Sequence, residues 1–219
     1  SGGLRQVART RAPALQIARG ALLAFEICVI VTSFALLGLA ETHAVFAVYT
    51  LIVVAGAGPI LGERVGWRRW AAVGVGFLGV LLILRPGMRV FDPTALVPLA
   101  GAAMFAGYHL ATRHVGRIDS PATSFFYTGV AGAVAITFVG PFFWTPMQGA
   151  DWLWMAALCV TGMTGHYLLI KALEAAEASA VQPFAYLQLL FASALGVAIF
   201  GEAIDAATLA GGVIIVGAG

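Results

Sequence analysis

The stretch that decides the fold is AETHAV at residues 40–45, which recurs in altered form as AEASAV at residues 176–181. Two further patterns follow each copy in the same order, a Gly-Glu pair at residues 62–63 and 201–202 and the pattern AxGVxxxG at residues 72–79 and 210–217. The offset is 136 residues for the first pair (40 to 176), 139 for the second (62 to 201) and 138 for the third (72 to 210). A nearly constant offset indicates two copies of one structural unit, separated by small changes in loop length.

The composition places the chain among integral membrane proteins. Hydrophobic residues make up 61% of the sequence and charged residues 10%, whereas charged residues account for about 25% of an average soluble domain. The mean hydropathy is +0.95. The net charge is only +2 and the basic residues lie between apolar runs, so we expect no nucleic-acid partner. Cys28 and Cys159 fall inside apolar runs and are expected to be buried, without a disulfide or a metal site.

Apolar runs long enough for a membrane-spanning helix, about 20 residues, set the number of crossings. Eight are predicted, at residues 14–39, 44–61, 70–84, 94–112, 122–143, 152–170, 180–200 and 206–219. None alternates as a strand of a membrane barrel would, and a helix satisfies its backbone hydrogen bonds within its own segment. The sequence therefore predicts an all-α integral membrane fold with about eight helices in this chain.

The twelve basic residues are unevenly distributed between the ends of these spans. With a cytoplasmic N-terminus, only Arg85 and Arg89 lie outside, and the other ten of the twelve lie at the inner ends. Because Lys and Arg accumulate on the cytoplasmic side, this distribution predicts a multi-pass protein with its N-terminus in the cytoplasm, in a bacterial inner (plasma) membrane. Residues 1–13 are interpreted as a basic cytoplasmic lead-in.

The number of crossings between the two copies predicts their relative direction. The first copy occupies spans one to three and the second spans six to eight, and an odd shift of five crossings inverts the copy in the membrane. We therefore expect inverted five-helix repeats, with residues 14–86 as the last three helices of a partial first repeat. Residues 94–219 would form a second repeat of five helices, the last one cut short. This predicts a ten-helix fold, N-terminally truncated in this chain, with two helices missing before Ser1.

The sequence GERVGWRRW at residues 62–70, together with Gly201-Glu202, resembles the EamA repeat of the drug/metabolite transporter superfamily. The resemblance covers nearly the whole chain from about Leu15 onward. It implies ten helices in two inverted five-helix repeats, and the movement of amino acids, metabolites, nucleotide-linked compounds or drugs. It is specific for the superfamily and weak for the substrate.

Ionisable side chains at membrane depth are costly to bury and are candidates for function. Glu26 lies about midway along the first span, where it could trade a proton or bind a cation; a protonated Glu bonded to a neighbouring helix is the alternative. His166 lies in the sixth span beside Tyr167, either as a proton acceptor and substrate contact or as a packing residue. Tyr108 and His109 lie near the inner end of the fourth span, where cavity and interfacial roles are both open.

Polar residues of the second and seventh spans complete the candidate set. Tyr49 lies well inside the second span, and Gln182 and Tyr186 are four residues apart and share a helix face. Pro183 is near the predicted start of its helix, so we expect a first-turn proline.

Two other patterns receive a structural interpretation. The glycines at 74, 76 and 79 have the spacing of a nucleotide-binding loop, but they lie in a membrane helix without a preceding strand, so they predict close helix packing. Glu63 and Glu202 lie at turns, where an acid favours the start of the following helix.

Together these observations predict a secondary active transporter for a small metabolite, amino acid or drug-like solute. It would work by alternating access with ion or exchange coupling, since no ATP-binding motif is present. The residues expected to bind substrate or couple its transport are Glu26, Tyr49, Tyr108, His109, His166, Tyr167, Gln182 and Tyr186. The expected partners are this solute and the lipid bilayer, and a homodimer is compatible with the sequence.

Two other classes of function stay open. An intramembrane enzyme acting on lipid-linked substrates would need a clustered set such as HExxH or an Asp-rich metal motif, and the four histidines are scattered singly. We therefore expect no catalytic residue, no metal and no cofactor. A membrane interaction protein that does not transport is the other alternative.

Overall fold

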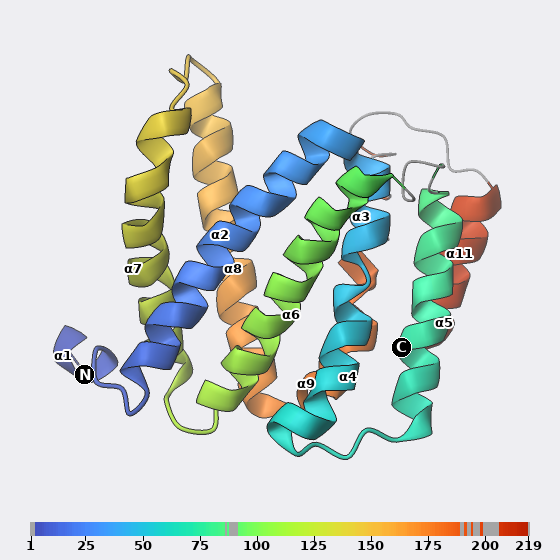
Figure 1. Cartoon of the computed structure of the whole chain (residues 1–219), viewed down its shortest axis with the longest axis horizontal. Coiled ribbons are helices and arrows are strands. Elements are labelled where there is room, and N and C mark those ends of the chain that lie inside the picture. Colours follow the sequence, from blue (N-terminus) through green and yellow to red (C-terminus); the bar gives the residue numbers. More distant parts are fainter. Residues whose placement is uncertain are drawn as a thin grey trace. The chain divides into compact units, whose positions relative to one another are not determined.

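The structure is a computed structural model that describes residues 3–85, 87, 92–188, 191, 194, 198 and 206–218. The regular secondary structure of these residues is helical, with no strand (Figure 1). In the described part of the chain, six segments are long and apolar enough to cross a membrane. They are α2 (Pro13–Leu37), the end of α3 with α4 (Thr42–Leu61), α5 (Trp67–Leu84), a 3-10 turn with α6 (Pro93–Val115), α7 with the following 3-10 turn (Pro121–Phe143), and α8 (Asp151–Ala175). The all-α membrane fold expected from the sequence is confirmed.

These six segments agree with the first six predicted spans to within a few residues. The seventh predicted span, 180–200, contains most of α9 (Ala178–Ala185), and much of its remainder lies outside the described residues. The eighth corresponds to α11 (Ala206–Ala218). A short helix α1 (Leu4–Val7) precedes α2. The boundaries of the two repeats stay a prediction.

Several helix ends follow from local sequence signals. At the start of α7 (Pro121–Val139), Pro121 occupies the first position and the Ser120 hydroxyl accepts the Thr123 N–H at 3.2 Å. Ahead of α6 (Leu96–Val115), the Asp92 carboxylate accepts the Thr94 N–H at 2.9 Å. α4 (Tyr49–Leu61) ends at Gly62, whose φ of 68° is a left-handed conformation that glycine adopts without strain.

The helices of the second and seventh spans are interrupted. α3 (Leu39–Phe46) and α4 are separated by a turn at residues 47–48, immediately before Tyr49. α9 begins at Ala178 and contains Pro183 near its end. The expectation of a first-turn proline is therefore wrong, because the helix starts earlier than the apolar run suggested. Pro183 lacks an N–H for the helix ladder, and α9 ends two residues later.

The chain forms two compact units. Unit 1 comprises Ser1–Phe25 and Ala111–Ala176, and unit 2 comprises Glu26–Leu110 and Glu177–Gly219. Unit 1 contains a buried polar network around Arg19, which is 1% exposed. Its guanidinium donates to Thr112 Oγ1 at 3.1 Å, to Gln16 Oε1 at 2.9 Å and to the Ser124 carbonyl at 2.6 Å. The network joins α2 to the end of α6 and the start of α7.

Asp119, in the connection between α6 and α7, extends this network towards the N-terminal segment. Its carboxylate accepts hydrogen bonds from the Thr10 hydroxyl, from Gln16 Nε2 at 3.0 Å and from the Arg11 N–H at 3.2 Å. Burial acts to raise the pKa of Asp119, but the bonds from Thr10, Gln16 and Arg11 and the charge of Arg11 outweigh it. They hold the pKa of this carboxyl below its ordinary value of 3.8.

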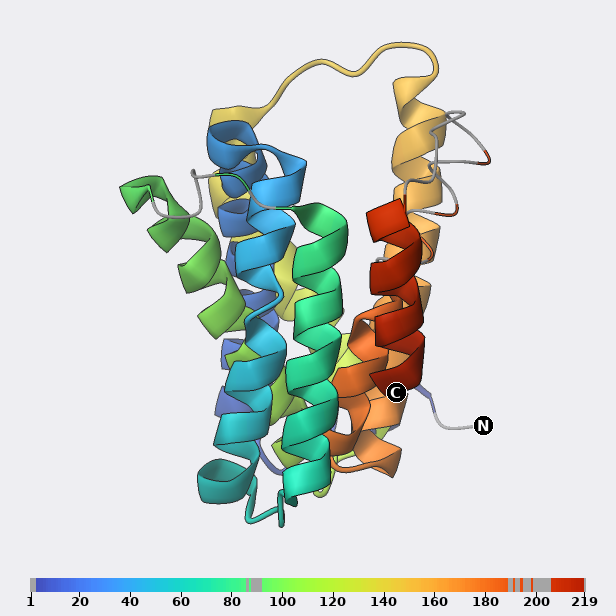
Figure 2. The same cartoon turned by 90° about the vertical axis from the view of Figure 1, so that its right-hand side faces the viewer.

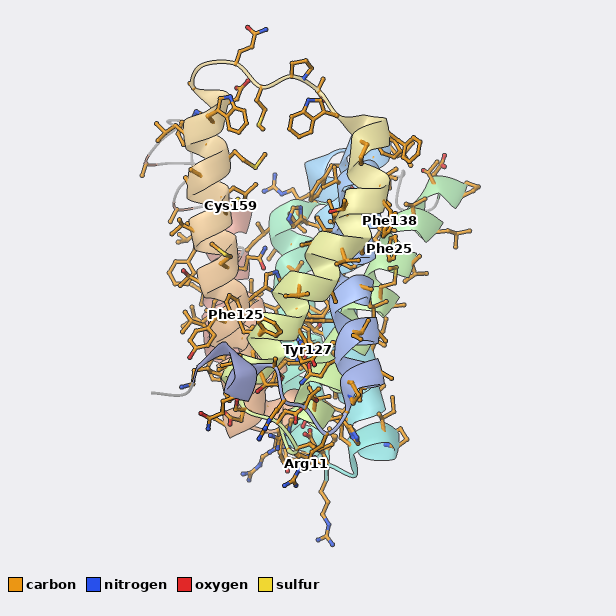
Figure 3. All side chains as sticks on the ribbon, turned by 90° about the vertical axis from the view of Figure 1, so that its left-hand side faces the viewer. Arg11, Phe25, Phe125, Tyr127, Phe138 and Cys159 are labelled. Atoms are coloured by element: carbon orange, nitrogen blue, oxygen red, sulfur yellow. The ribbon has the colours of Figure 1, made fainter. Side chains whose placement is uncertain are left out.

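Helices α7 and α8 of unit 1 present large apolar side chains at the surface. Phe138 on α7 is 73% exposed, and residues 151–161 of α8 are all exposed. Cys159 lies on this part of α8 (Figure 3), so the expectation that it is buried is wrong. Cys28 is half-buried, and both thiols are free. Apolar surface on helices of this length is suited to contact with lipid tails.

In unit 2, α5 and α11 lie side by side (Figure 2). A Cβ atom at Gly79 would lie 2.9 Å from the Gly211 carbonyl oxygen, and one at Gly211 would lie 2.7 Å from that of Gly79. The two backbones therefore approach too closely for any larger residue at this crossing. The predicted packing role of the glycine pattern is confirmed at Gly79, whereas a Cβ at Gly74 would contact nothing within 4 Å.

Candidate functional site

Most of the predicted site residues come together in unit 2. Tyr49, Tyr108, His109, Gln182 and Tyr186 are all buried there, on α4, on α6 and in or just after α9. The ring centroid of His109 lies 5.4 Å from that of Tyr49 and 6.2 Å from that of Tyr108. This set is called the polar–aromatic cluster below.

Phe105 links the rings of this cluster. It lies four residues before His109 on α6 and therefore shares its helix face. Its ring centroid is 4.6 Å from that of His109 and 4.9 Å from that of Tyr49, both in edge-on geometry. The sequence reasoning missed Phe105, although its spacing from His109 was a usable signal. The aromatic faces and edges here provide a surface on which a planar or cationic group can pack.

Gln182 is fully buried beside His109. Its Nε2 atom donates to the Ala178 carbonyl at 3.1 Å and lies 3.4 Å from His109 Nδ1. Only an N–H can be bonded to a carbonyl, so the Ala178 contact fixes which end of the amide is the nitrogen. The oxygen Oε1 is buried without a hydrogen-bond partner among the described residues. The cluster thus contains an acceptor that a bound solute with an N–H or O–H group would satisfy.

The Tyr186 hydroxyl is hydrogen-bonded to Thr50 Oγ1. These residues are 136 positions apart, the offset that relates AETHAV to AEASAV. Two positions that the sequence repeat predicts to be equivalent are therefore in direct contact. Beside them is a small cavity of about 40 Å³, lined in part by His43, Tyr49 and Tyr186. Thr50 was not among the predicted site residues.

Glu26 belongs to the same unit and lies about midway along α2. Its side chain is buried, and it interacts electrostatically with Tyr49. The cluster therefore has a carboxyl group within electrostatic reach.

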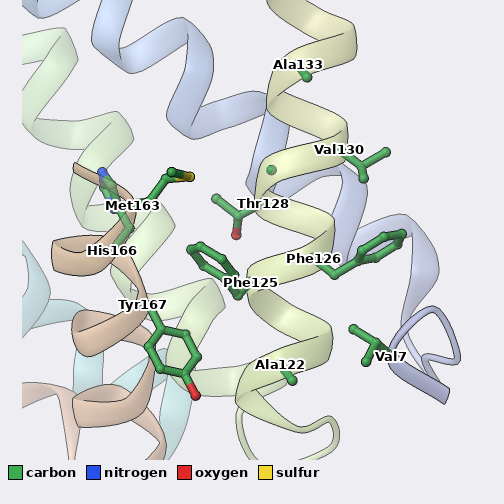
Figure 4. Close-up of a pocket in the computed structure, with 11 residues that line it drawn as sticks. Val7, Ala122, Phe125, Phe126, Thr128, Val130, Ala133, Met163, His166 and Tyr167 are labelled. Carbon is green, nitrogen blue, oxygen red and sulfur yellow. The ribbon is translucent and has the colours of Figure 1, made fainter. Parts of the chain in front are cut away.

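His166 and Tyr167 lie in unit 1, on α8. They line an open, largely apolar cavity of about 650 Å³ between α7 and α8 (Figure 4). Phe125 of α7 meets the Tyr167 ring edge-on, with centroids 5.3 Å apart, and Lys171 Nζ lies 6.0 Å from the Tyr167 centroid. The structure thus distributes the eight predicted residues over two sites, six in unit 2 and these two in unit 1.

The described part of the chain holds no group of three or more His, Cys, Asp or Glu residues that could hold a metal ion. The polar–aromatic cluster combines hydrogen-bond donors and acceptors, aromatic rings and a nearby carboxyl group.

The sequence profile of the EamA-like transporter family matches residues 93–218. The chain is 31% identical over 159 residues to an S-adenosylmethionine uptake transporter of Rickettsia felis, covering 71% of this chain and 53% of that protein. It is 30% identical over 200 residues to a riboflavin transporter of Rhizobium johnstonii, covering 89% of this chain and 65% of that protein. It is also 30% identical over 158 residues to the pseudopaline exporter CntI of Pseudomonas aeruginosa, covering 71% and 56%.

The alignments with several of these curated relatives span only about half of the relatives' length. A solved crystal structure of a protein, 20% identical, superposes with a TM-score of 0.80 and covers 97% of this chain and 76% of the other. At that identity the likeness shows the fold alone. The matching family and these relatives are all named for transport. Since the family profile matches more than half of its residues, the chain belongs to the EamA-like transporter family.

Proposed function

We propose that the protein containing this chain is a secondary active transporter that moves a small metabolite, amino acid or drug-like solute by alternating access, driven by an ion or by exchange. The observation that carries the proposal is the buried polar–aromatic cluster of unit 2. Polar groups in an apolar membrane bundle are expensive, and the cluster includes an acceptor, Gln182 Oε1, without a partner among the described residues. A bound solute that donates a hydrogen bond to this acceptor would offset the free-energy cost of burying it.

The roles follow from the side chains. Gln182 and His109 would hydrogen-bond the solute, and the rings of Tyr49, Tyr108 and Tyr186 would pack against it. Glu26 would couple transport to a proton or cation, since it is the buried carboxyl group that interacts with Tyr49. His166 and Tyr167 would contact solute at the unit 1 cavity.

The relatives support a small solute and leave its direction of movement open. Their names include the uptake of S-adenosylmethionine, the transport of riboflavin and the export of pseudopaline. Each of these proteins is named for a small metabolite, and we infer a solute of that size for this one.

The first test is a ligand-stabilisation screen on the complete purified protein across metabolite classes. A ligand present at about 100 times its Kd stabilises the folded state by about 2.7 kcal/mol, which a thermal shift detects. The hit is then tested for uptake into proteoliposomes. His109→Ala should abolish both signals, and His114→Ala, a matched control five residues later on α6 with an exposed side chain, should preserve both. Equal signals from the two variants would show that the solute does not use the cluster.

Coupling has a separate test. In the complete protein, Glu26→Gln should remove the dependence of uptake on a proton or cation gradient while leaving solute binding in place. Normal uptake with an unchanged pH dependence would exclude Glu26 as the coupling residue.

The membrane and the orientation are also proposals. The positive-inside distribution of Lys and Arg supports a bacterial inner membrane with a cytoplasmic N-terminus, and Arg9 and Arg11 are exposed ahead of α2. A cysteine introduced at Arg11 in a background without Cys28 and Cys159 should react with an impermeant thiol reagent only after the cells are opened. Labelling in intact cells would reverse the orientation.

A further inference from the structure

Glu63, in the turn that follows α4, makes contacts that its position in the sequence does not suggest. Its carboxylate accepts the Ala178 N–H at 2.9 Å, the Ser179 N–H at 3.2 Å and the Ser179 hydroxyl at 3.1 Å. The side chain is only 6% exposed. The expectation that Glu63 assists the following helix is wrong, because α5 has Gly66 as its N-cap and no side-chain cap. Its partner is the start of α9, 115 residues later. Glu202, the equivalent residue, lies outside the described residues.

The start of α9 needs such a partner. The first N–H groups of any helix have no acceptor within the helix, and they attract negative charge. Glu177, the N-cap of α9, makes no side-chain cap bond. α9 is also short, eight residues, and contains Pro183, so its internal hydrogen bonds are few. Bonds from N–H groups to a carboxylate are among the stronger hydrogen bonds, and here both lie in a buried place.

The residue that Glu63 holds is also the residue that orients Gln182. The Ala178 N–H donates to Glu63, and the Ala178 carbonyl accepts Gln182 Nε2. At the far end of the same helix, Tyr186 bonds to Thr50 near the start of α4. α4 is therefore tied to the α9 segment near both of its ends, and two members of the polar–aromatic cluster are placed by these ties.

We propose that Glu63 is a positioning residue for transport: by clamping the start of α9 to the turn after α4, it sets the positions of Gln182 and Tyr186, and release of this clamp opens the cluster on that side. The inference rests on the proposed transport function. Arg69 strengthens the clamp at its edge, because its guanidinium pairs with Glu177 and donates to Ser179 Oγ at 2.9 Å. The two paired side chains are 34% and 39% exposed, so this ion pair contributes much less than the buried carboxylate.

The first experiment compares Glu63→Ala, Glu63→Gln and the matched control Glu177→Gln in the complete protein. Uptake kinetics in proteoliposomes are normalised to folded protein. Glu63→Ala should lower the maximal rate by about tenfold, equivalent to about 1.4 kcal/mol. Glu63→Gln, which keeps one acceptor oxygen, should fall in between. Glu177→Gln, which removes only the edge pair, should stay within about twofold of the wild type.

Two results would overturn the inference: a wild-type maximal rate and KM for folded Glu63→Ala, or an equal loss for Glu177→Gln. All rates refer to folded protein, so a loss of stability does not lower them. A partial recovery of the rate in Glu63→Gln relative to Glu63→Ala therefore points to positioning by the remaining acceptor oxygen. If Glu63→Ala cannot be purified, a second experiment that leaves Glu63 in place tests the clamp.

That experiment locks the clamp. In a background with Cys28 and Cys159 replaced by Ser, Arg69→Cys and Glu177→Cys are combined and bridged by a short bifunctional thiol reagent. Bridging should stop uptake, and single-cysteine controls treated with the reagent should keep it. A bridged protein that transports at the unbridged rate would show that the clamp does not need to be released. That result would overturn this inference and leave the proposed transport function standing. Absence of uptake in the folded wild-type protein would instead overturn the proposed transport function on which the inference rests.

Discussion

A single methyl group added at Gly76 should disturb the candidate site directly. A Cβ atom there would lie 2.5 Å from Cδ2 and 2.8 Å from Cε2 of the Tyr186 ring. Ordinary carbon–carbon contacts are about 3.5–4.0 Å, so the ring must move by about 1 Å. Tyr186 is buried among Val73, Val80 and Ile215, which leaves it little room. Gly76→Ala should therefore displace the Tyr186 hydroxyl from Thr50.

The size of the effect can be estimated from three contributions. Overpacking in a filled core costs about 1–3 kcal/mol. Loss of the Thr50–Tyr186 hydrogen bond costs about 1 kcal/mol more. Alanine is more favourable than glycine in a helix by about 1 kcal/mol, which offsets part of the cost. The expected net loss for Gly76→Ala is about 1–3 kcal/mol. Gly74→Ala, two residues earlier on the same helix, meets nothing within 4 Å and should be neutral or slightly stabilising.

The assay compares Gly76→Ala, Gly74→Ala and the wild type in one detergent. Thermal midpoints are recorded at one fixed scan rate, because membrane proteins often unfold irreversibly. Uptake per folded molecule is measured in parallel. Gly76→Ala should lose both stability and uptake, while Gly74→Ala should lose neither. Equal behaviour of the two variants would refute the packing of α5 against Tyr186.

Three further predictions concern other parts of the chain. Asp119 has a lowered pKa in the folded state, so its contribution to stability is complete above about pH 4 and is lost as the pH falls through the folded pKa. Asp119→Asn should therefore be less stable than the wild type at neutral pH, and the difference should vanish in acid unfolding curves. Gln182→Leu removes the buried amide, whose oxygen has no partner among the described residues, so the thermal midpoint should be kept or raised while solute binding is lost in calorimetry. Gly79→Ala brings a methyl group to 2.9 Å from the Gly211 carbonyl and should destabilise the protein by about 1–3 kcal/mol in the same thermal assay, whereas Gly129→Ala, with no atom within 4 Å, should not.

The sequence was sufficient to predict features that depend on neighbouring residues. Six spans were found because an apolar run of membrane length must be helical, whatever it packs against. The crossing at Gly79 was predicted because repeated small residues indicate close helix approach. Gln182 and Tyr186 were paired by their spacing of four residues, and both are members of the cluster.

Features that depend on residues far apart in the chain were missed. Glu63 was assigned to the helix beside it, but the start of α9 offers two N–H groups with no acceptor in their own helix, which only the folded chain brings near Glu63. Arg19 was read as one more positive charge at an inner boundary, yet Thr112 and Ser124, about 100 residues away, provide acceptors for it in the interior. The break before Tyr49 has no Gly or Pro to mark it, and hydropathy does not detect it.

The contact between Thr50 and Tyr186 has a consequence for the direction of the proposed transport. When two copies of an inverted unit exchange their conformations, each residue takes up the position of its equivalent. A hydrogen bond between two equivalent residues, such as Thr50 and Tyr186, is therefore kept. With the repeats inverted as the sequence predicts, this contact would be present in both the inward-facing and the outward-facing state of the proposed cycle. A solute anchored beside this contact in the proposed cycle would have the Thr50–Tyr186 pair next to it in both states. Its binding there favours neither direction, and net flow is then set by the concentrations on the two sides and by the driving ion.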